Sequence, residues 1–314
     1  MKHTKCAIVT GANGFVGSYV VHALSRSNYD VWAVVRNTQS NIDNLCGENI
    51  HIIYCDLQNI KALPSKIKRR DFDCFYHLAW EGSSGSQRAN YLMQMNNATA
   101  SAQAVDTAKQ LGCRRFVGAG SITELMYGDY LKQDGSQPDM VTCYAIGKIA
   151  AEFLCRCVAV EKGIDFVWGY LSNFYGVGDQ TQNFINFLIQ SYLQGQTPSL
   201  TDGKQLADFT YVSDIAKGIV LLGEKAIAGN TYYVGYGKPR ALREYILDVR
   251  NSVAPNLEAG IGQKEFHGLS VDFNKINIKK LFLDTGFQPS ISFNDGIALT
   301  LDWFKTGRYS PWIV

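Results

Sequence analysis

A tyrosine and a lysine four residues apart could carry proton-transfer chemistry in this sequence. Tyr144 and Lys148 lie in the stretch CYAIGKIAAE at 143–152, and on a helix this spacing puts both side chains on one face. A free tyrosine, with a pKa of about 10, is a poor base at neutral pH, but an adjacent ammonium stabilises its phenolate. The pair therefore predicts that Tyr144 exchanges a proton with a substrate oxygen and that Lys148 tunes it.

A hydroxyl group upstream could serve the same oxygen. The apolar run at 115–119 (RFVGA) is typical of a buried strand, and it leads into Gly120 and Ser121. Side chains at the carboxyl end of a parallel strand reach the crevice where such sheets bind ligands. We therefore expect Ser121 to hydrogen-bond the substrate oxygen that Tyr144 protonates.

A glycine-rich stretch near the start of the chain predicts a dinucleotide cofactor. In VTGANGFVGSYV, at 9–20, an apolar run precedes the glycines and a helical pattern begins at about Phe15. Gly11 and Gly14 would allow a tight turn and a close approach to pyrophosphate, while Gly17 would let the helix pack against the sheet. The helix N-terminus, with free N–H groups, favours the anion.

The residue after the second predicted strand bears on the choice of cofactor. An acidic side chain there hydrogen-bonds the ribose 2′-hydroxyl of NAD, whereas an arginine accepts the 2′-phosphate of NADP. The sequence offers Val35 and Arg36, and Asp30 lies at the opposite end of the strand. Arg36 therefore predicts a preference for NADP(H), with NAD(H) as the other possibility.

The elements that would position these residues alternate between short apolar runs and helical patterns through about residue 172. The helices include one at 97–111, and the strands are expected at 6–10, 31–35, 50–54, 73–79, 115–119 and 165–171. Such alternation predicts an α/β fold with a doubly wound parallel sheet of the Rossmann type, over 1–173. After this the regular alternation of strands and helices ends, which indicates a smaller, mixed α/β C-terminal substrate-binding domain at 174–314. Within it, residues 208–235 are expected to return to the first domain.

The composition narrows the possible partners. Among 314 residues the net charge is only +2, so nothing indicates a nucleic-acid surface, and no apolar run is long enough to span a membrane. The eight cysteines are scattered, which fits free thiols in a reducing compartment, and we expect a cytoplasmic protein. The absence of C-x-x-C and H-x-x-x-H spacings gives no support for a metal site.

Several of these motifs together resemble one family. GANGFVG, then HLAW at 77–80, then Ser121 and YAIGK have the order and spacing typical of the extended short-chain dehydrogenase/reductases, also called the NAD-dependent epimerase/dehydratase family. The resemblance covers nearly the whole chain. It extends to Asp56 and Leu57, to Asn97, to Asn173 in LSNFYGVG and to DFTYVSD at 208–214.

The resemblance implies a role for each matching residue. Ser121, Tyr144 and Lys148 would be the catalytic trio, and Ser121, Thr123 and Asn173 would bind substrate. The cofactor would contact Gly11, Asn13, Gly14, Phe15, Val16, Gly17, Arg36, Asp56, Leu57, Leu78, Ala79, Trp80, Asn97, Ala119, Tyr144, Lys148 and Leu171. Trp80 could equally be an ordinary core aromatic.

Two departures from the family pattern limit what the resemblance implies. Many relatives have an arginine that holds substrate phosphate before the D-F motif, where this chain has Ala207. The dehydratase members carry Thr-Asp-Glu where we align Ser121, Ile122 and Thr123, and Glu124 is one position out of register. Elimination of water therefore lacks its acid and base in this alignment.

The remaining reactions are reduction of a carbonyl and epimerisation through oxidation and re-reduction. Because Arg36 favours an exchangeable NADPH, we expect reduction of the C4 keto group of a nucleotide-linked 4-keto-6-deoxyhexose. The alternatives are a nucleotide-sugar 4-epimerase with bound NAD and a reductase of a non-nucleotide ketone. A redox-sensing protein without activity fits less well, because the tyrosine–lysine pair is retained. Relatives also suggest a homodimer formed through the helices at 97–111 and 143–160.

Overall fold

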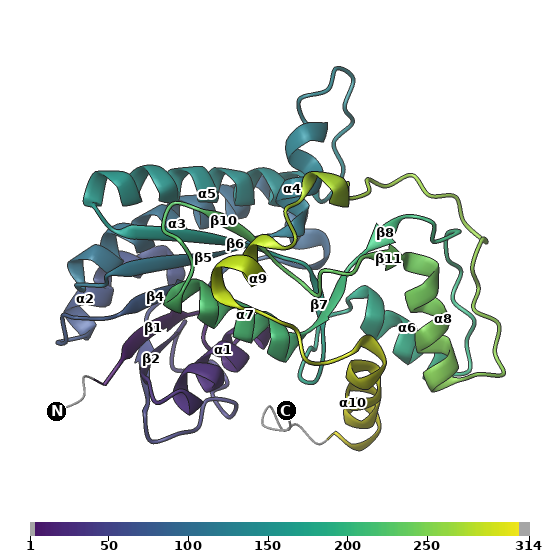
Figure 1. The fold of residues 1–314 in the computed structure, drawn as a ribbon, viewed down its shortest axis with the longest axis horizontal. Helices are drawn as coiled ribbons and strands as arrows, with labels where there is room; N and C mark the ends of the chain where they lie inside the picture. The colour runs from purple at the N-terminus through teal and green to yellow at the C-terminus, as the bar shows by residue number, and fades with distance from the viewer. Residues whose placement is uncertain (1–3, 308–314) are drawn as a thin grey trace.

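Seven parallel strands form the central sheet of the protein, which a computed structural model describes over residues 4–307 (Figure 1). Their order across the sheet is β10-β6-β5-β4-β1-β2-β3, so the direction of winding reverses between β1 and β4. This confirms the doubly wound Rossmann prediction. The strands are β1 (Cys6–Thr10), β2 (Asp30–Val35), β3 (Ile50–Tyr54), β4 (Cys74–His77), β5 (Arg115–Ser121), β6 (Asp165–Leu171) and β10 (Thr231–Val234).

Helices cover both faces of this sheet. On one face lie α1 (Phe15–Arg26) and α7 (Val212–Glu224), and on the other lie α3 (Tyr91–Gln110), α5 (Thr142–Lys162), α2 (Leu63–Lys66) and the short helix η1 (Leu57–Ala62) (Figure 1). The central strands β1 and β4 are buried on both sides, which explains their continuous apolar runs. Within residues 4–307 no helix is both long and apolar enough to cross a lipid bilayer.

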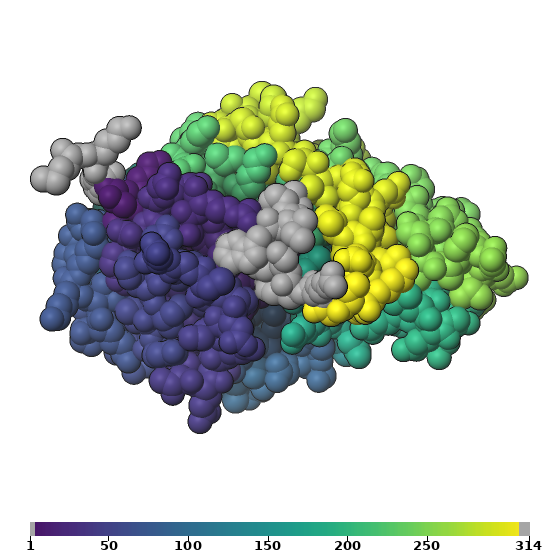
Figure 2. All heavy atoms as spheres, turned by 90° about the horizontal axis from the view of Figure 1, so that it is seen from below, coloured from purple at the N-terminus to yellow at the C-terminus, as the bar shows by residue number. Residues whose placement is uncertain are grey.

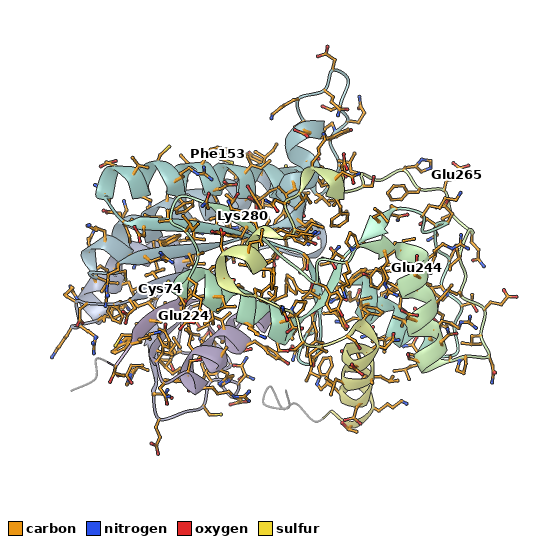
Figure 3. The ribbon with its side chains drawn as sticks, viewed as in Figure 1. Cys74, Phe153, Glu224, Glu244, Glu265 and Lys280 are labelled. Atoms are coloured by element: carbon orange, nitrogen blue, oxygen red, sulfur yellow. The ribbon has the colours of Figure 1, made fainter. Side chains whose placement is uncertain are left out.

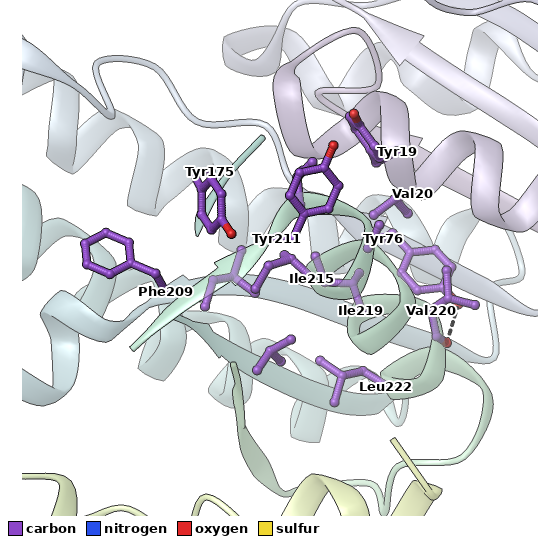
Figure 4. Packing of buried hydrophobic residues seen from close by; sticks show 14 of the residues in the cluster. Tyr19, Val20, Tyr76, Tyr175, Phe209, Tyr211, Ile215, Ile219, Val220 and Leu222 are labelled. Atoms are coloured by element: carbon purple, nitrogen blue, oxygen red, sulfur yellow. Dashed lines mark hydrogen bonds between the residues drawn. The ribbon is translucent and has the colours of Figure 1, made fainter. Parts of the chain in front are cut away.

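Aromatic side chains fill the core on each face. Under α3 and α5, the rings of Phe75, Phe116 and Phe166 stack in a row across neighbouring strands, 5.5 and 6.3 Å apart. Each such ring stabilises the fold by about 1.5–3 kcal/mol through burial. On the opposite face, the hydroxyl of Tyr76 donates a hydrogen bond to the carbonyl of Val220 in α7, which ties that helix to β4 (Figure 4).

The second part of the molecule lies beyond the carboxyl ends of the strands. It contains two small sheets, one of β7 (Asn173–Tyr175) with β9 (Phe209–Tyr211) and one of β8 (Leu206–Ala207) with β11 (Arg240–Ala241). Its helices are α6 (Phe184–Leu193), α8 (Leu242–Val253) and α10 (Phe293–Thr306). Figure 2 shows the two parts side by side, with the purple N-terminal region at one end and the green and yellow C-terminal regions at the other.

The chain crosses between the two parts more than once. After β9 it enters α7 and then β10, which pairs with β6 in the main sheet. The predicted limits of 1–173 and 174–314 remain a prediction, and residues 1–3 and 308–314 within them lie outside the described residues. The remaining short elements are η2 (Gly85–Ala89), α4 (Ile122–Tyr130), η3 (Phe273–Lys275) and α9 (Lys280–Thr285).

The helix predicted at 97–111 begins earlier than the sequence pattern suggested. It starts at Tyr91, because the side chain of Asn90 caps it by accepting a hydrogen bond from the amide of Met93. Asn97 therefore does not open the helix but lies buried in its second turn. The predicted end is confirmed, since Gly112 follows with a left-handed φ of 73°.

Candidate functional site

The glycine-rich loop lies where the winding of the sheet reverses, between the ends of β1 and β4. Gly11 has a φ of +66°, and a Cβ atom there would lie 2.8 Å from the amide nitrogen of Ala79 in the neighbouring loop. A Cβ on Gly17 would lie 2.0 Å from the carbonyl oxygen of Gly11. Both positions therefore need glycine for the loop to turn and for α1 to approach it.

The start of α1 fits a bound pyrophosphate. Gly14 precedes the first turn in an extended conformation, and among the described residues no side chain caps it and no acidic residue occupies that turn. The first amides of a helix have no partner within the helix, so they are available to an anion. The predicted cofactor residues Phe15 and Val16 belong to this turn, and Asn13 precedes it, its side-chain amide bonded to the carbonyl of Asn41.

A buried histidine fixes the loop after β4 that faces the glycines. His77 lies between the hydroxyls of Thr10 and Ser101, at 2.9 and 3.0 Å, and burial lowers its pKa to about 3, so the ring is neutral. The Thr10 hydroxyl also accepts hydrogen bonds from the amides of Leu78 and Ala79. This network holds the predicted cofactor residues Leu78 and Ala79 against β1.

Trp80 packs against the core under α3 and α5 and also contacts both members of the tyrosine–lysine pair. Its indole N–H donates to the side-chain oxygen of Gln94 at 2.8 Å, and its ring packs edge-on against Tyr144. The ammonium of Lys148 lies 3.8 Å from the centre of the Trp80 ring. A cation over an indole face is stabilised by the ring quadrupole. Trp80 therefore orients both members of the tyrosine–lysine pair.

Lys148 is buried, and its surroundings set its charge. Its ammonium donates a hydrogen bond to the carbonyl of Ala119 at 2.8 Å, at the end of β5. Burial lowers the pKa of Lys148, and the carboxylate of Glu124 opposes that shift. Burial in turn raises the pKa of Glu124, which Lys148 opposes. Each group therefore supports the charged form of the other.

Glu124 also holds the loop that carries Ser121. Its carboxylate accepts hydrogen bonds from the amide of Ser121, at 2.5 Å, and from the indole of Trp168, at 3.1 Å. The Ser121 hydroxyl accepts from the amide of Thr123, which completes a capping box at the start of α4. The Glu124 carboxylate therefore ties the start of α4 to β6, because Trp168 lies in β6.

Tyr144 meets the Ser121 side chain at the edge of the sheet. Burial raises the pKa of Tyr144, while a hydrogen bond from Ser121 and the guanidinium of Arg88 act in the opposite direction. The Arg88 guanidinium lies 4.9 Å from the centre of the tyrosine ring. The hydroxyl oxygens of Ser121 and Thr123 lie 2.9 Å apart. Two hydroxyls and a phenol are thus grouped around one position.

We expect Glu124→Gln to shift the pH dependence of any turnover that uses Lys148. Without the carboxylate, the main opposition to the lowering of the Lys148 pKa by burial is lost, so Lys148 loses its proton at a lower pH. As the pH is raised, turnover that depends on the ammonium should therefore begin to decline at a lower pH in the variant than in the wild-type protein. The measurement is kcat/KM between pH 6 and 10.

Glu152→Gln is the matched control for this experiment. Glu152 is also buried, on the same helix as Lys148, but its carboxylate bonds Arg156 and Tyr170 and is not among the charges that act on Lys148. The decline of kcat/KM at alkaline pH should therefore occur at the same pH in Glu152→Gln as in the wild-type protein. If kcat/KM of Glu124→Gln also declines at the wild-type pH, Glu124 does not set the charge of Lys148.

Other predicted cofactor residues lie after β2, after β3 and within α3. Arg36 follows β2 and is half exposed, with a guanidinium nitrogen 3.5 Å from the carboxylate of Glu81. Asn97 holds Glu81 through two hydrogen bonds to its backbone, at 2.7 and 3.2 Å. Asp56 follows β3 and caps the helix that begins at Leu57.

The predicted substrate residue Asn173 lies at the entrance to the second part. It is the first residue of β7 and is exposed, directly after the end of β6 at Leu171. Its backbone pairs with that of Phe209 in β9. The structure thus brings the ends of β1, β4, β5 and β6 to one edge, with Asn173 on the side of the second part.

Sequence reasoning missed three residues of this site. Glu124 could have been found, because S-x-x-E is the spacing of a capping box. Gln94 is fully buried, and its amide donates to the carbonyls of Gly82 and Gln87 while accepting from Trp80. Neither Gln94 nor Arg88 has a local sequence signal, since their partners lie elsewhere in the chain.

Comparison with known proteins gives relatives over nearly the whole chain. CDP-abequose synthase of Salmonella typhimurium is 26% identical, over 92% of this chain and 95% of that protein. UDP-N-acetylglucosamine 4-epimerase of Methanobrevibacter ruminantium, solved with UDP-N-acetylmuramic acid, has a TM-score of 0.77 at 24% identity, covering 98% of this chain and all of that one. The Bordetella bronchiseptica enzyme WbmF, solved with NADH, has a TM-score of 0.80 at 19% identity, over 97% and 93% of the two chains.

At these identities the solved structures establish the fold, and the family is shown by a direct match. Residues 7–235, from the first strand through the last strand of the main sheet, match the NAD dependent epimerase/dehydratase family. That range contains the glycine-rich loop, Ser121 and the tyrosine–lysine pair. The chain belongs to the NAD dependent epimerase/dehydratase family, within the extended short-chain dehydrogenase/reductases.

Proposed function

We propose that the protein is a nucleotide-sugar 4-epimerase that works with bound NAD. The observation that carries this proposal is the grouping of Tyr144 with the Ser121 and Thr123 hydroxyls, beside a helix N-terminus that fits a dinucleotide. The relatives support it, because their names include 4-epimerases solved with UDP-sugars and with NAD. This differs from the reduction that the sequence favoured and matches its stated alternative.

The residues of the chain supply positioning and proton transfer in this proposal. Bound NAD provides a hydride acceptor and donor and, when oxidised, a positive charge that favours the phenolate of Tyr144. Tyr144 takes the proton of the sugar hydroxyl and later returns it to the oxygen. The Ser121 hydroxyl orients that oxygen, and Lys148 keeps a cation near the phenol. General acid–base catalysis of this kind contributes about 10²–10⁴-fold in rate.

The surroundings of Arg36 favour NAD(H) over the NADP(H) that the sequence suggested. Arg36 follows β2, where we expect the adenosine ribose of the cofactor to bind. The carboxylate of Glu81 lies 3.5 Å from its guanidinium. A 2′-phosphate there would meet a carboxylate as well as an arginine, whereas a 2′-hydroxyl can donate to the carboxylate. We therefore propose that NAD(H) is the physiological cofactor.

Reduction of a 4-keto sugar is the second candidate, and one observation favours it. Burial raises the pKa of Tyr144, so the phenol holds its proton and is ready to donate it to a carbonyl oxygen. A reductase must exchange its cofactor after each turnover, whereas an epimerase keeps it. Retention of the cofactor therefore separates the two candidates.

We propose that the protein is a homodimer in the cytoplasm. Apolar side chains lie exposed on the outer faces of α3 and α5, and Phe153 points away from the sheet there (Figure 3). These residues are Tyr91, Leu92, Met95, Ile146, Phe153, Leu154 and Val160. An apolar patch of this kind on two adjacent helices is suited to pairing with its own copy. The eight cysteines are free thiols, which supports a reducing compartment.

Native mass spectrometry of the purified protein tests these proposals together. We expect the mass of a dimer that carries two molecules of NAD, because a catalyst that returns its hydride does not release the cofactor. A dimer without cofactor that binds NADPH on addition would favour the reductase. A monomer at micromolar concentration would contradict the proposed use of the α3 and α5 faces.

A further inference from the structure

The second part of the molecule contains a pocket that brings two cations together with four aromatic rings. The cavity has a volume of about 230 Å³ and is lined by Phe209, Tyr245, Phe293, Lys238, Arg240 and Asp248, among others. Pockets that enclose a whole drug-sized ligand measure roughly 300–1,000 Å³. This pocket can therefore hold one portion of a larger ligand, and its lining favours an anionic portion.

Arg240 is held in a fixed position in this pocket. Its guanidinium lies 4.0 Å from the centre of the Tyr245 ring and donates to the carboxylate of Asp248 at 3.0 Å. A guanidinium carries five N–H groups, more than one carboxylate oxygen can accept. Stacking on an aromatic ring leaves the planar fork oriented, and this fork matches the geometry of a phosphate.

Lys238 is placed by a buried carboxylate beneath its loop. Asp208 is fully buried and accepts a hydrogen bond from the amide of Gly237 at 2.9 Å and one from the hydroxyl of Tyr233 at 2.8 Å. Thr210 accepts from the amide of Tyr236, so Asp208 and Thr210, on either side of Phe209, anchor this loop. With Lys238 and Arg240 against Asp248, the pocket carries a net positive charge.

The pocket is joined to the candidate active site through paired strands. Phe209, in its wall, is the register partner of Asn173, which follows the end of β6. On the adjacent small sheet, Arg240 is the register partner of Ala207. Directly opposed residues of an antiparallel pair project from the same face, so the Arg240 side chain lies on the face where position 207 offers only a methyl group.

We propose that Arg240 and Lys238 bind the diphosphate of the nucleotide-sugar substrate in this pocket. This inference rests on the proposed function, and it assigns the phosphate contacts to β11 and the loop before it. Asp248 orients Arg240 and also competes with phosphate for its N–H groups. The two roles lead to different expectations for the variants below.

The test is calorimetric titration of NAD-loaded protein with UDP, CDP and dTDP. For the diphosphate that wild-type protein binds, Arg240→Gln should weaken binding about tenfold or more, because charged hydrogen bonds to phosphate are lost. Lys238→Gln should weaken it less, and since Lys238 is exposed this variant should fold normally. Lys264→Gln, which changes a lysine of a different cavity, is the matched control and should bind like wild type.

Asp248→Asn distinguishes phosphate binding from a purely structural role of Arg240. If Arg240 only fastens α8 through Asp248, Asp248→Asn should weaken binding as much as Arg240→Gln. If Arg240 binds phosphate, Asp248→Asn should bind as well as wild type or more tightly, since a competing negative charge is removed.

The possible failures are distinguishable. Wild-type affinity in both Arg240→Gln and Lys238→Gln would overturn this inference and leave the proposed function intact. Wild-type protein that binds none of the three nucleoside diphosphates would overturn the proposed function, and this inference with it.

Discussion

Replacing Tyr144 with phenylalanine should lower kcat by at least about 100-fold while leaving cofactor binding unchanged, because acid–base catalysis contributes about 10²–10⁴-fold. The change removes only the hydroxyl oxygen that exchanges a proton with the substrate. The ring remains, so its edge-on packing with Trp80 and its contact with Arg88 are preserved. The measurements are kcat with the nucleotide sugar and the Kd for NAD.

Tyr130→Phe is the matched control for this loss. Tyr130 lies at the end of α4, and its hydroxyl donates to the carbonyl of Gln137 outside the candidate site. The same atom is removed, yet kcat should remain near the wild-type value. If Tyr144→Phe retains more than a few per cent of turnover, Tyr144 is not the proton-transferring residue.

Replacing Gly17 with alanine should disrupt the cofactor loop and destabilise the protein. The added methyl carbon would lie 2.0 Å from the carbonyl oxygen of Gly11 and 2.9 Å from its carbonyl carbon, so α1 must move away from the loop. Overpacking of this kind costs typically about 1–3 kcal/mol and sometimes more. The amides that face the pyrophosphate move with the helix, so we expect the Kd for NAD to rise at least about tenfold, which is 1.4 kcal/mol.

Gly128→Ala provides the matched control. Gly128 lies within α4, and a Cβ atom there would meet nothing within 4 Å. Alanine is preferred over glycine in a helix by about 0.8–1.0 kcal/mol, so this variant should be as stable as wild type or slightly more stable. Thermal unfolding with and without NAD measures both variants. A Gly17→Ala protein with the melting temperature and NAD affinity of wild type would refute the close approach of α1 to the loop.

The sequence was most informative where local spacing determines structure. The alternation of apolar runs and helical patterns predicted the parallel sheet, and the glycine spacing placed the start of α1 at Phe15, as the structure shows. The spacing of Tyr144 and Lys148 put them on one helix for the same reason. Each of these elements is recognised from residues that are close together in the sequence.

The features that sequence reasoning missed depend on contacts between distant residues. Gln94 is recognisable only once Trp80 and Gly82 fold onto it, and Arg88 only once its loop covers Tyr144. The start of α3 depended on a cap at Asn90 that the apolar pattern does not signal. The pairing of Arg240 with Ala207 required the register of two short strands, which no local pattern specifies.

The position of β10 has a consequence for how the protein is made. This strand completes the main sheet against β6, and α7 covers Tyr76 through a bond to Val220, 144 residues further along the chain. While a ribosome is still synthesising the second part, the edge of β6 and the face that α7 will cover remain open. An uncovered strand edge beside apolar surface is prone to aggregate. We therefore expect the nascent chain to be most prone to aggregation before residues 212–234 have emerged from the ribosome.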